Sequence, residues 1–346
     1  MGASPSCKIF EQFSDSIQWI LQNHYGIPHV VKVLDDFLFI RPTKHQCQQD
    51  LNTFLSLCAD IGVPVAPHKT QGPLTTITFL GIELDSSSME ARLPPEKLQK
   101  YTEDVQQLAK SSKTTLTNLK SVIGKLQFAT SVIPAGRAFL RRLHNLTIGI
   151  DKPYYYLRLT QPAKQDLEMW ATFLEQYNGI NIIRPPSVAT SHQLNLCADS
   201  SKIGFGATYG TSWIYGTWPE SWQKLHITFL ELYPIYTLIE IFAHKLKNSR
   251  ITFWSDNMGV VDILNKQTSK CHLVMQLVRP LVLTLLKYNI TLKSSHIPGK
   301  DNILCDAISR QKHTPHLLHQ YGVKDKPTTV PDHLQPHNFQ LHFNKP

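Results

Sequence analysis

The chain has 346 residues and carries 35 Lys and Arg against 26 Asp and Glu, a formal net charge of +9. Hydrophobic residues make up 42% of it, which is too many for a disordered chain and enough for the cores of two or three domains. The basic excess favours a polyanionic partner, although charge alone defines no fold.

The six cysteines are scattered, and no two of them form a Cys-x-x-Cys pair. This spacing argues against a disulfide framework and a zinc ribbon, and it predicts free thiols in an intracellular compartment, either nucleus or cytoplasm. The most apolar stretch, residues 227–246, contains Glu231 and Glu240 and is a poor membrane-spanning helix. We therefore expect no membrane association.

The first elements follow one another closely. Residues 27–42 predict two strands joined by a tight turn, and residues 43–61 predict a helix that ends at Gly62. Residues 75–94 predict short strands around Gly81.

Two adjacent carboxylates, Asp35 and Asp36, occupy the turn of the first strand pair, between two apolar segments. In apolar surroundings adjacent carboxylates cost free energy unless a cation neutralises them, and hard oxygen ligands suit Mg²⁺. Asp is also a common turn residue, so an ordinary Asp-Asp turn explains the pattern equally well.

Residues 105–150 contain no Asp or Glu. Apolar residues recur at helical spacing from Leu116 to Leu126, and a second helix is predicted from Arg137, after a break at Pro134 and Gly136. Because an ordinary solvated face mixes charges of both signs, this pattern favours a phosphate-contacting surface. The candidate contacts are Lys113, Lys120, Lys125, Arg137, Arg141 and Arg142.

From residue 194 to residue 310 the pattern predicts three strands, a long helix, a strand, helices, a strand and a helix. Asp199 and Asp256 end apolar strands, Glu231 lies in the long helix, and Asp306 lies in the last short helix. Taken singly, each acid has an ordinary explanation as a turn, cap or helix-edge residue. Together they favour one site, where two Mg²⁺ ions, with Mn²⁺ as an alternative, would offset the repulsion and activate water for phosphodiester hydrolysis.

These motifs resemble ribonuclease H, whose acids follow the order Asp, Glu, Asp, Asp. The matching segments are Asp199-Ser200-Ser201, Glu231, Ser255-Asp256-Asn257 and residues 296–302 leading to Asp306. The resemblance implies cleavage of RNA in RNA–DNA hybrids, with the four acids as catalytic metal ligands and Asn257 as a nucleic-acid contact. It also implies that His296 assists proton transfer or product release, with an ordinary exposed loop histidine as the alternative.

The earlier region resembles reverse transcriptases. Residues 33–37 are similar to their metal-binding hairpin, aromatic-x-Asp-Asp, with Val33 in the aromatic position. Residues 2–6, 67–70, 79–84 and 119–143 resemble, in the same order, a Gly/Ser/Pro segment, a segment with a nucleic-acid-contacting Lys (Lys69), the primer grip and the thumb. The resemblance implies that Asp35 and Asp36 bind metal. The family's third metal-binding Asp precedes the Gly/Ser/Pro segment, so we expect an inactive polymerase module and a partner that supplies the remaining fingers and palm.

The resemblance as a whole is to reverse transcriptase–ribonuclease H polyproteins, most of all those of DIRS-like and gypsy-type retrotransposons. It implies an α+β and α/β chain with a partial palm at 1–95, a basic helical thumb and connection at 96–190, and a ribonuclease H-like domain at 191–312. That last domain would hold a mixed five-stranded sheet with helices. Residues 313–346 read as a Pro- and His-rich tail that acts as a linker. The alternatives are an inactive nucleic-acid-binding remnant of a mobile element and a remnant that cannot fold stably.

Overall fold

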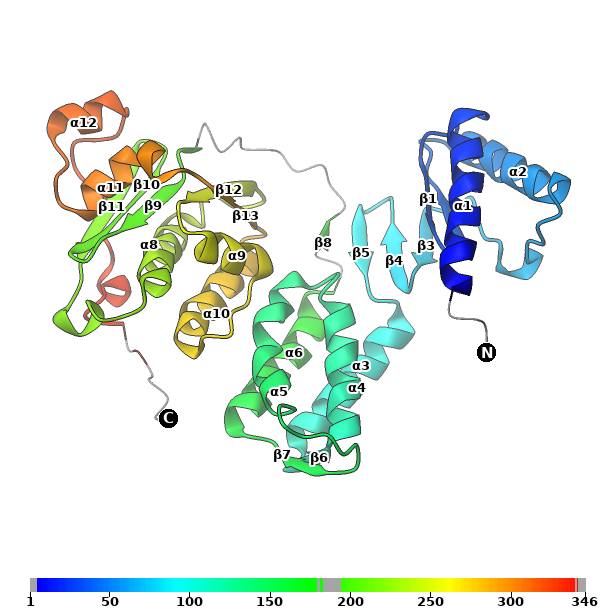
Figure 1. Ribbon diagram of the computed structural model, residues 1–346, viewed down its shortest axis with the longest axis horizontal. Helices are drawn as coiled ribbons and strands as arrows, with labels where there is room; N and C mark the ends of the chain where they lie inside the picture. Colours follow the sequence, from blue (N-terminus) through cyan, green and yellow to red (C-terminus); the bar gives the residue numbers. More distant parts are fainter. Residues whose placement is uncertain (1–4, 179–180, 183–193, 340, 342–346) are drawn as a thin grey trace. The chain divides into compact units, whose positions relative to one another are not determined.

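The computed structural model describes residues 5–178, 181–182, 194–339 and 341. The chain divides into two compact units, which Figure 1 shows together. The first comprises Met1–Leu98 and Asn178–Arg184, and the second comprises Gln99–Tyr177 and Pro185–Pro346. The predicted domain boundary at residues 190 and 191 and the first residues of the Gly/Ser/Pro segment lie outside the described residues.

The first unit begins with a helix on a hairpin. Helix α1 (Ser6–Asn23) packs on strands β1 (Val30–Val33) and β2 (Asp36–Phe39), and α2 (Lys44–Asp60) follows. The Thr43 hydroxyl accepts a hydrogen bond from the Gln46 amide, which caps α2 at its start. The buried core of these elements is Ile17, Leu21, Ile27, Val30, Phe54, Leu57 and Cys58.

A four-stranded antiparallel sheet completes the first unit, in the order β3-β4-β5-β8. Its strands are β3 (Thr76–Phe79), β4 (Ile82–Asp85), β5 (Glu90–Arg92) and β8 (Asn181–Ile182). Leu80 and Gly81 both have positive φ, which is the turn geometry that joins two strands through two residues. The predicted strands around Gly81 are therefore confirmed.

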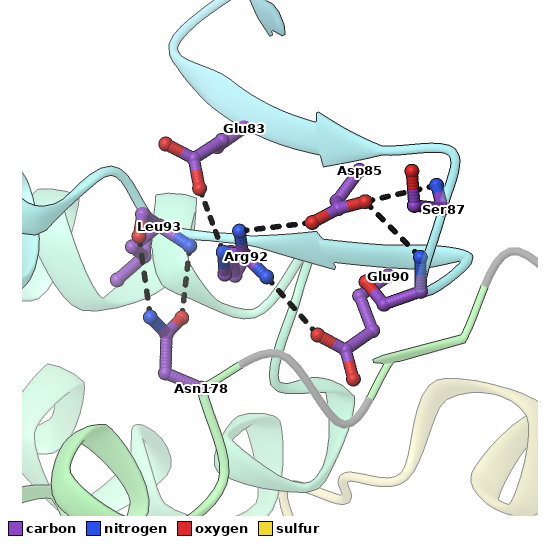
Figure 2. A network of polar contacts seen from close by, with 8 residues as sticks. Glu83, Asp85, Ser87, Glu90, Arg92, Leu93 and Asn178 are labelled. Carbon is purple, nitrogen blue, oxygen red and sulfur yellow. Dashed lines mark hydrogen bonds and ion pairs between the residues drawn. The ribbon is translucent and has the colours of Figure 1, made fainter. Parts of the chain in front are cut away.

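Arg92 is the centre of a polar network on this sheet (Figure 2). Its guanidinium pairs with Glu83 at 2.7 Å, Glu90 at 3.1 Å and Asp85 at 3.3 Å. Next to it, the Asn178 side chain accepts a hydrogen bond from the Leu93 amide and donates one to the Leu93 carbonyl. One cation thus offsets the repulsion among three carboxylates on adjacent strands.

The second unit starts with the basic helical region. Its elements are α3 (Pro95–Lys110, whose first turn belongs to the first unit), β6 (Lys113–Thr115), α4 (Leu116–Ala129), α5 (Arg141–Asn145), β7 (Tyr156–Arg158) and α6 (Gln161–Gln176). The predicted apolar face of α4 is buried. The second predicted helix starts at Arg141 rather than Arg137, because Pro134–Phe139 forms a 3₁₀ segment. There Gly136 lies so close to the Trp170 ring that a Cβ atom would stand 2.2 Å from it.

The rest of the second unit is built on a five-stranded mixed sheet, in the order β11-β10-β9-β12-β13. Strands β9 (Cys197–Ser200), β10 (Gly204–Tyr209) and β11 (Ser212–Thr217) are antiparallel, whereas β12 (Arg250–Ser255) runs parallel to β9 and β13 (Thr291–His296) runs parallel to β12. The accompanying helices are α8 (Ile227–Phe242), α9 (Met258–Lys266), α10 (His272–Lys287) and α11 (Ile303–Ser309). The α+β class and the mixed five-stranded sheet predicted for a ribonuclease H-like region are confirmed.

Residues 313–339, here named the C-terminal segment, pack on this sheet, so the prediction of a linker is wrong for them. Leu318 of α12 (Pro315–Gln320) and Val323 share an apolar cluster with Trp213, Leu304 and Ile308. Backbone amides of the segment also donate to carbonyls of β11 and its turn, and the Tyr233 hydroxyl donates to the Leu334 carbonyl at 2.6 Å. The few apolar residues of the segment are irregularly spaced, which is why periodicity did not reveal this packing.

All six cysteines are free thiols. No helix in the described part of the chain is both long and apolar enough to cross a bilayer.

Replacing Arg92 by Met is expected to lower the free energy of unfolding by about 1–2 kcal/mol, because Glu83, Asp85 and Glu90 lose their shared cation. Urea unfolding followed by circular dichroism measures the change. Arg158→Met, which removes an exposed guanidinium from β7, is the matched control. Equal stability of the two variants would contradict the role of the Arg92 network.

Replacing Tyr233 by Phe is expected to cost about 1 kcal/mol, because the Leu334 carbonyl loses its buried hydrogen-bond donor. Thermal unfolding of the full chain measures this loss beside Tyr215→Phe, which removes a hydroxyl from an exposed tyrosine of β11. A Tyr233→Phe variant as stable as the Tyr215→Phe variant would mean that the C-terminal segment does not dock through this contact.

Candidate active site

The pairing of β9 with β12 places two of the predicted site residues side by side. Trp254 lies opposite Cys197 in this parallel pair. Side chains alternate between the faces of a sheet, so two positions further along each strand Asp256 and Asp199 are neighbours on the same face. Both acids stand at the carboxyl ends of their strands, which is the position predicted from the sequence.

Glu231 joins them from the helix that packs on β9. The Ser200 hydroxyl donates to the Leu230 carbonyl at 2.9 Å, and this buried bond ties β9 to the first turns of α8. Burial, together with the charges of Asp256 and Asp199, raises the pKa of Glu231 to about 7, against a hydrogen bond from Asn257 that lowers it. These effects place the three acids within electrostatic reach of one another.

Asp199 is the most enclosed of the acids, at 7% exposure. Burial is the main cause that raises its pKa, and Asp256 and Asp306 contribute in the same direction. The Ser309 hydroxyl of α11 opposes the shift by donating to Asp199 Oδ2 at 2.6 Å. Helix α11 therefore covers β9 and holds this carboxylate in place.

Asp306 stands apart from the other three acids in its contacts. It lies on the exposed side of α11, where the Arg310 guanidinium pairs with it at 2.7 Å, one helical turn away. Among the residues that the structure describes, no group of three or more His, Cys, Asp or Glu side chains is close enough to hold a metal ion. The carboxylates thus share one edge of the sheet without converging on a point.

Two carboxylate oxygens at this edge lack partners. Glu231 Oε2 and Asp256 Oδ1 are buried side-chain oxygens without a hydrogen-bond donor. A buried acceptor without a donor costs free energy, and more so if it is charged. Carboxylate oxygens are the ligands that Mg²⁺ prefers, so this donor set fits the predicted ion.

His296 and Asn257 border the same edge. His296 ends β13 opposite Ser255, is exposed, and lines a cavity of about 340 Å³ together with Trp254 and Asn302. Asn257 caps α9, since its Oδ1 accepts from the Gly259 and Val260 amides, while its side chain also bonds Glu231. Its predicted contact with nucleic acid remains a prediction.

The predicted hairpin forms, with Asp35 in its turn and Asp36 at the first position of β2. Both acids are exposed, so the apolar setting assumed for them is wrong. Water can solvate the two carboxylates, and no burial of their charges calls for a neutralising cation. Helix α1 fixes the turn instead. Glu11 accepts from the Leu34 amide, and Lys32 pairs with Glu11 and Asp15 at 2.7 Å each.

The predicted phosphate contacts fall into three groups: exposed cations, cations in ion pairs, and Arg141, which is half-buried and has no ion pair within the described residues. Lys69, Lys113, Lys120 and Arg137 are exposed, and the Lys113 ammonium lies over the Tyr156 ring. Lys125 pairs with Asp104 at 2.6 Å, and Arg142 pairs with Asp166 at 3.0 Å. Both acids come from outside the carboxylate-free run, so the run is less uniformly basic in the fold than in the sequence.

The edge of the sheet where Asp199, Glu231, Asp256 and Asp306 lie is here named the acidic edge. Sequence reasoning missed three polar residues that organise it. Ser309 holds Asp199, Arg310 holds Asp306, and the buried Asn302 side chain donates to the Ala198 carbonyl at 3.0 Å. The i,i+4 spacing of Asp306 and Arg310 could have revealed their ion pair. The other two bonds join residues more than a hundred positions apart, and no local signal predicts them.

No protein-family profile matches the chain. Over 138 residues, 40% of this chain, it is 28% identical to the Gag-Pro-Pol polyprotein of bovine leukemia virus (isolate Australian). Over 159 residues, 46% of this chain, it is 24% identical to the Gag-Pro-Pol polyprotein of human T-cell leukemia virus 2. The matched stretches span about a tenth of each polyprotein, 9% and 10%.

Solved structures give weaker similarities over more of the chain. A foamy viral protease-reverse transcriptase in complex with double-stranded DNA is 16% identical with a TM-score of 0.45, covering 85% of this chain and 59% of that one. The same kind of protein in complex with an RNA/DNA hybrid is 16% identical with a TM-score of 0.41, covering 92% of this chain and 39% of that one. The chain is thus similar in sequence to part of two viral Gag-Pro-Pol polyproteins.

Proposed function

We propose that the second unit is a Mg²⁺-dependent nuclease of the ribonuclease H type, which hydrolyses RNA in RNA–DNA hybrids. The observation that carries this proposal is the acidic edge, where the register of β9 and β12 sets Asp199 beside Asp256. Buried, unpartnered oxygens of Glu231 and Asp256 at the same edge support it, because a cation would satisfy both.

Four residues would hold the ions: Asp199, Glu231, Asp256 and Asp306. When bound, two Mg²⁺ or Mn²⁺ ions supply an activated water and stabilise the leaving oxyanion. Ser309 keeps Asp199 in place through its hydroxyl, and Asn257 orients Glu231. The exposed His296, at the end of β13, would exchange a proton with a departing product.

The exposed cations of the helical region would contact the phosphates of the same duplex. Lys113, Lys120 and Arg137 are the exposed candidates that no carboxylate neutralises by an ion pair within the described residues. We infer that the chain is a piece of a retroelement polyprotein, of the DIRS-like or gypsy type. The similarity to two Gag-Pro-Pol polyproteins supports the polyprotein origin, whereas the DIRS-like or gypsy type rests on the sequence motifs alone.

The first unit would be part of a reverse-transcriptase palm that needs a partner. Helix α1 exposes Ile9, Phe13 and Trp19 on the side away from its core, and β1 and β2 pair only with each other in the described part of the chain. A second polypeptide segment that supplies further palm strands and fingers would cover these apolar side chains and sheet edges.

An inactive nucleic-acid-binding protein is the second candidate function. The observation that favours it is the Arg310–Asp306 pair, which occupies one of the four carboxylates, together with the dispersed arrangement of the acids in the described residues. On this hypothesis the exposed cations bind nucleic acid while the acidic edge performs no chemistry.

Purified full-length chain is expected to cleave a labelled RNA–DNA hybrid in Mg²⁺ and to stop when EDTA removes the ion. Asp256→Asn is expected to lower the rate at least about a hundredfold, because it removes a charge that would bind the ion. Asp325→Asn, at an exposed position of the C-terminal segment, is the matched control and keeps the rate. A folded, hybrid-binding chain that does not cleave would favour the inactive candidate.

Asp35→Asn combined with Asp36→Asn is expected to leave hybrid cleavage unchanged, and the unaltered chain alone is expected to extend no primer. Both acids lie on one exposed hairpin, whereas two-metal phosphoryl transfer needs carboxylates from more than one strand. A primer-extension assay with Mg²⁺ and deoxynucleotides measures this. Extension by the unaltered chain that the double substitution abolishes would prove the expectation wrong.

A further inference from the structure

A second cavity in the same unit is lined by cations and lies apart from the acidic edge. It has a volume of about 320 Å³ and lies between α5 and the start of α10. Its lining in the described part of the chain includes Arg141, Arg142, Lys270, His272, Gln276 and Arg279, with no Asp or Glu there. This group is here named the arginine pocket.

The carboxylate of Asp166 contacts two of the pocket's arginines and offsets part of their positive charge. Asp166, almost fully buried, pairs with Arg142 at 3.0 Å and with Arg279 at 2.8 Å. A single carboxylate facing two guanidinium groups, with Arg141 and Lys270 beside them, leaves an excess of positive charge in a partly enclosed space. Cations in such a place cost free energy until an anion neutralises them.

Arg141 lines the pocket without an ion-pair partner among the described residues. Its Nε is buried and has no hydrogen-bond partner in the structure. The pocket also lies where α10 begins, at His272, with Lys270 just before the helix. The amino end of a helix carries a partial positive charge, so the backbone adds to the field of the side chains.

The guanidinium groups are held ready before any ligand arrives. Besides Asp166, Arg279 contacts the Ala138 carbonyl at 3.4 Å and lies 5.4 Å from the centre of the Phe139 ring. Arg142 donates to the Pro162 carbonyl at 3.2 Å. Fixed guanidinium groups lose little conformational entropy on binding, and their planar donors match the oxygens of a phosphate.

We propose that the arginine pocket binds phosphate groups, either as a compact oligophosphate anion or as backbone phosphates of a nucleic-acid strand. The cavity, the excess charge and the unpartnered Arg141 Nε carry the inference independently of the nuclease proposal. Only the nucleic-acid source rests on the proposed function.

Two probes distinguish the sources: sodium tripolyphosphate, and a labelled RNA–DNA hybrid in EDTA so that no cleavage occurs. Isothermal titration and thermal unfolding of the full chain measure the first, and fluorescence anisotropy measures the second. The variants are Arg141→Gln and the exposed Lys270→Gln, which keeps the test intact if the first variant fails to fold. Lys247→Gln removes an equal charge from an exposed site outside the pocket.

Tripolyphosphate is expected to bind and to raise the melting temperature more than sulfate at equal ionic strength, with affinity roughly tenfold or more lower in either pocket variant. Hybrid affinity that falls in the pocket variants without tripolyphosphate binding supports the strand source. If neither probe distinguishes the pocket variants from Lys247→Gln, the inference is overturned. Hybrid cleavage by the unaltered chain is scored separately, so failure of the nuclease proposal leaves the tripolyphosphate result interpretable.

Discussion

Strand β9 pairs in parallel with β12 and antiparallel with β10, and this junction fixes where acidic side chains can meet. With Trp254 opposite Cys197, Asp199 and Asp256 become neighbours without any bond between them. A slip of one residue would turn one of the two acids to the other face of the sheet. Helices α8 and α11 then add to this edge through Ser200 and Ser309, each of which bonds a neighbouring element from inside the core.

A second constraint joins the basic helices to the sheet region within the second unit. Asp166 on α6 is almost fully buried and binds one guanidinium from α5 and another from α10. Losing that carboxylate would leave two partly buried cations facing each other, which costs more than the loss of an exposed ion pair. The two guanidinium groups that Asp166 holds therefore serve the fold and also line the arginine pocket.

The local sequence pattern was sufficient to predict those elements whose structure depends on residues close together in the chain. The apolar face of α4 and the strand ends at Asp199 and Asp256 could be read directly. Pattern failed where the deciding partner is distant: the acids that pair with Lys125 and Arg142 lie outside the basic run, and the C-terminal segment docks through a few irregularly spaced side chains. It also failed for the exposed hairpin acids, because apolar neighbours in sequence do not bury a turn.

Asp306 differs energetically from the other acids of the acidic edge, because it forms an ion pair with Arg310. Its bond with Arg310 is an exposed pair one helical turn apart, with side chains 44% and 51% exposed, and such pairs contribute about 0.3–0.5 kcal/mol. Asp199, by contrast, is buried and Glu231 half-buried beside a third carboxylate, and burial with mutual repulsion raises the pKa of both. Releasing Asp306 from Arg310 would thus cost little free energy. The Arg310 pair is therefore only a weak restraint on the Asp306 side chain.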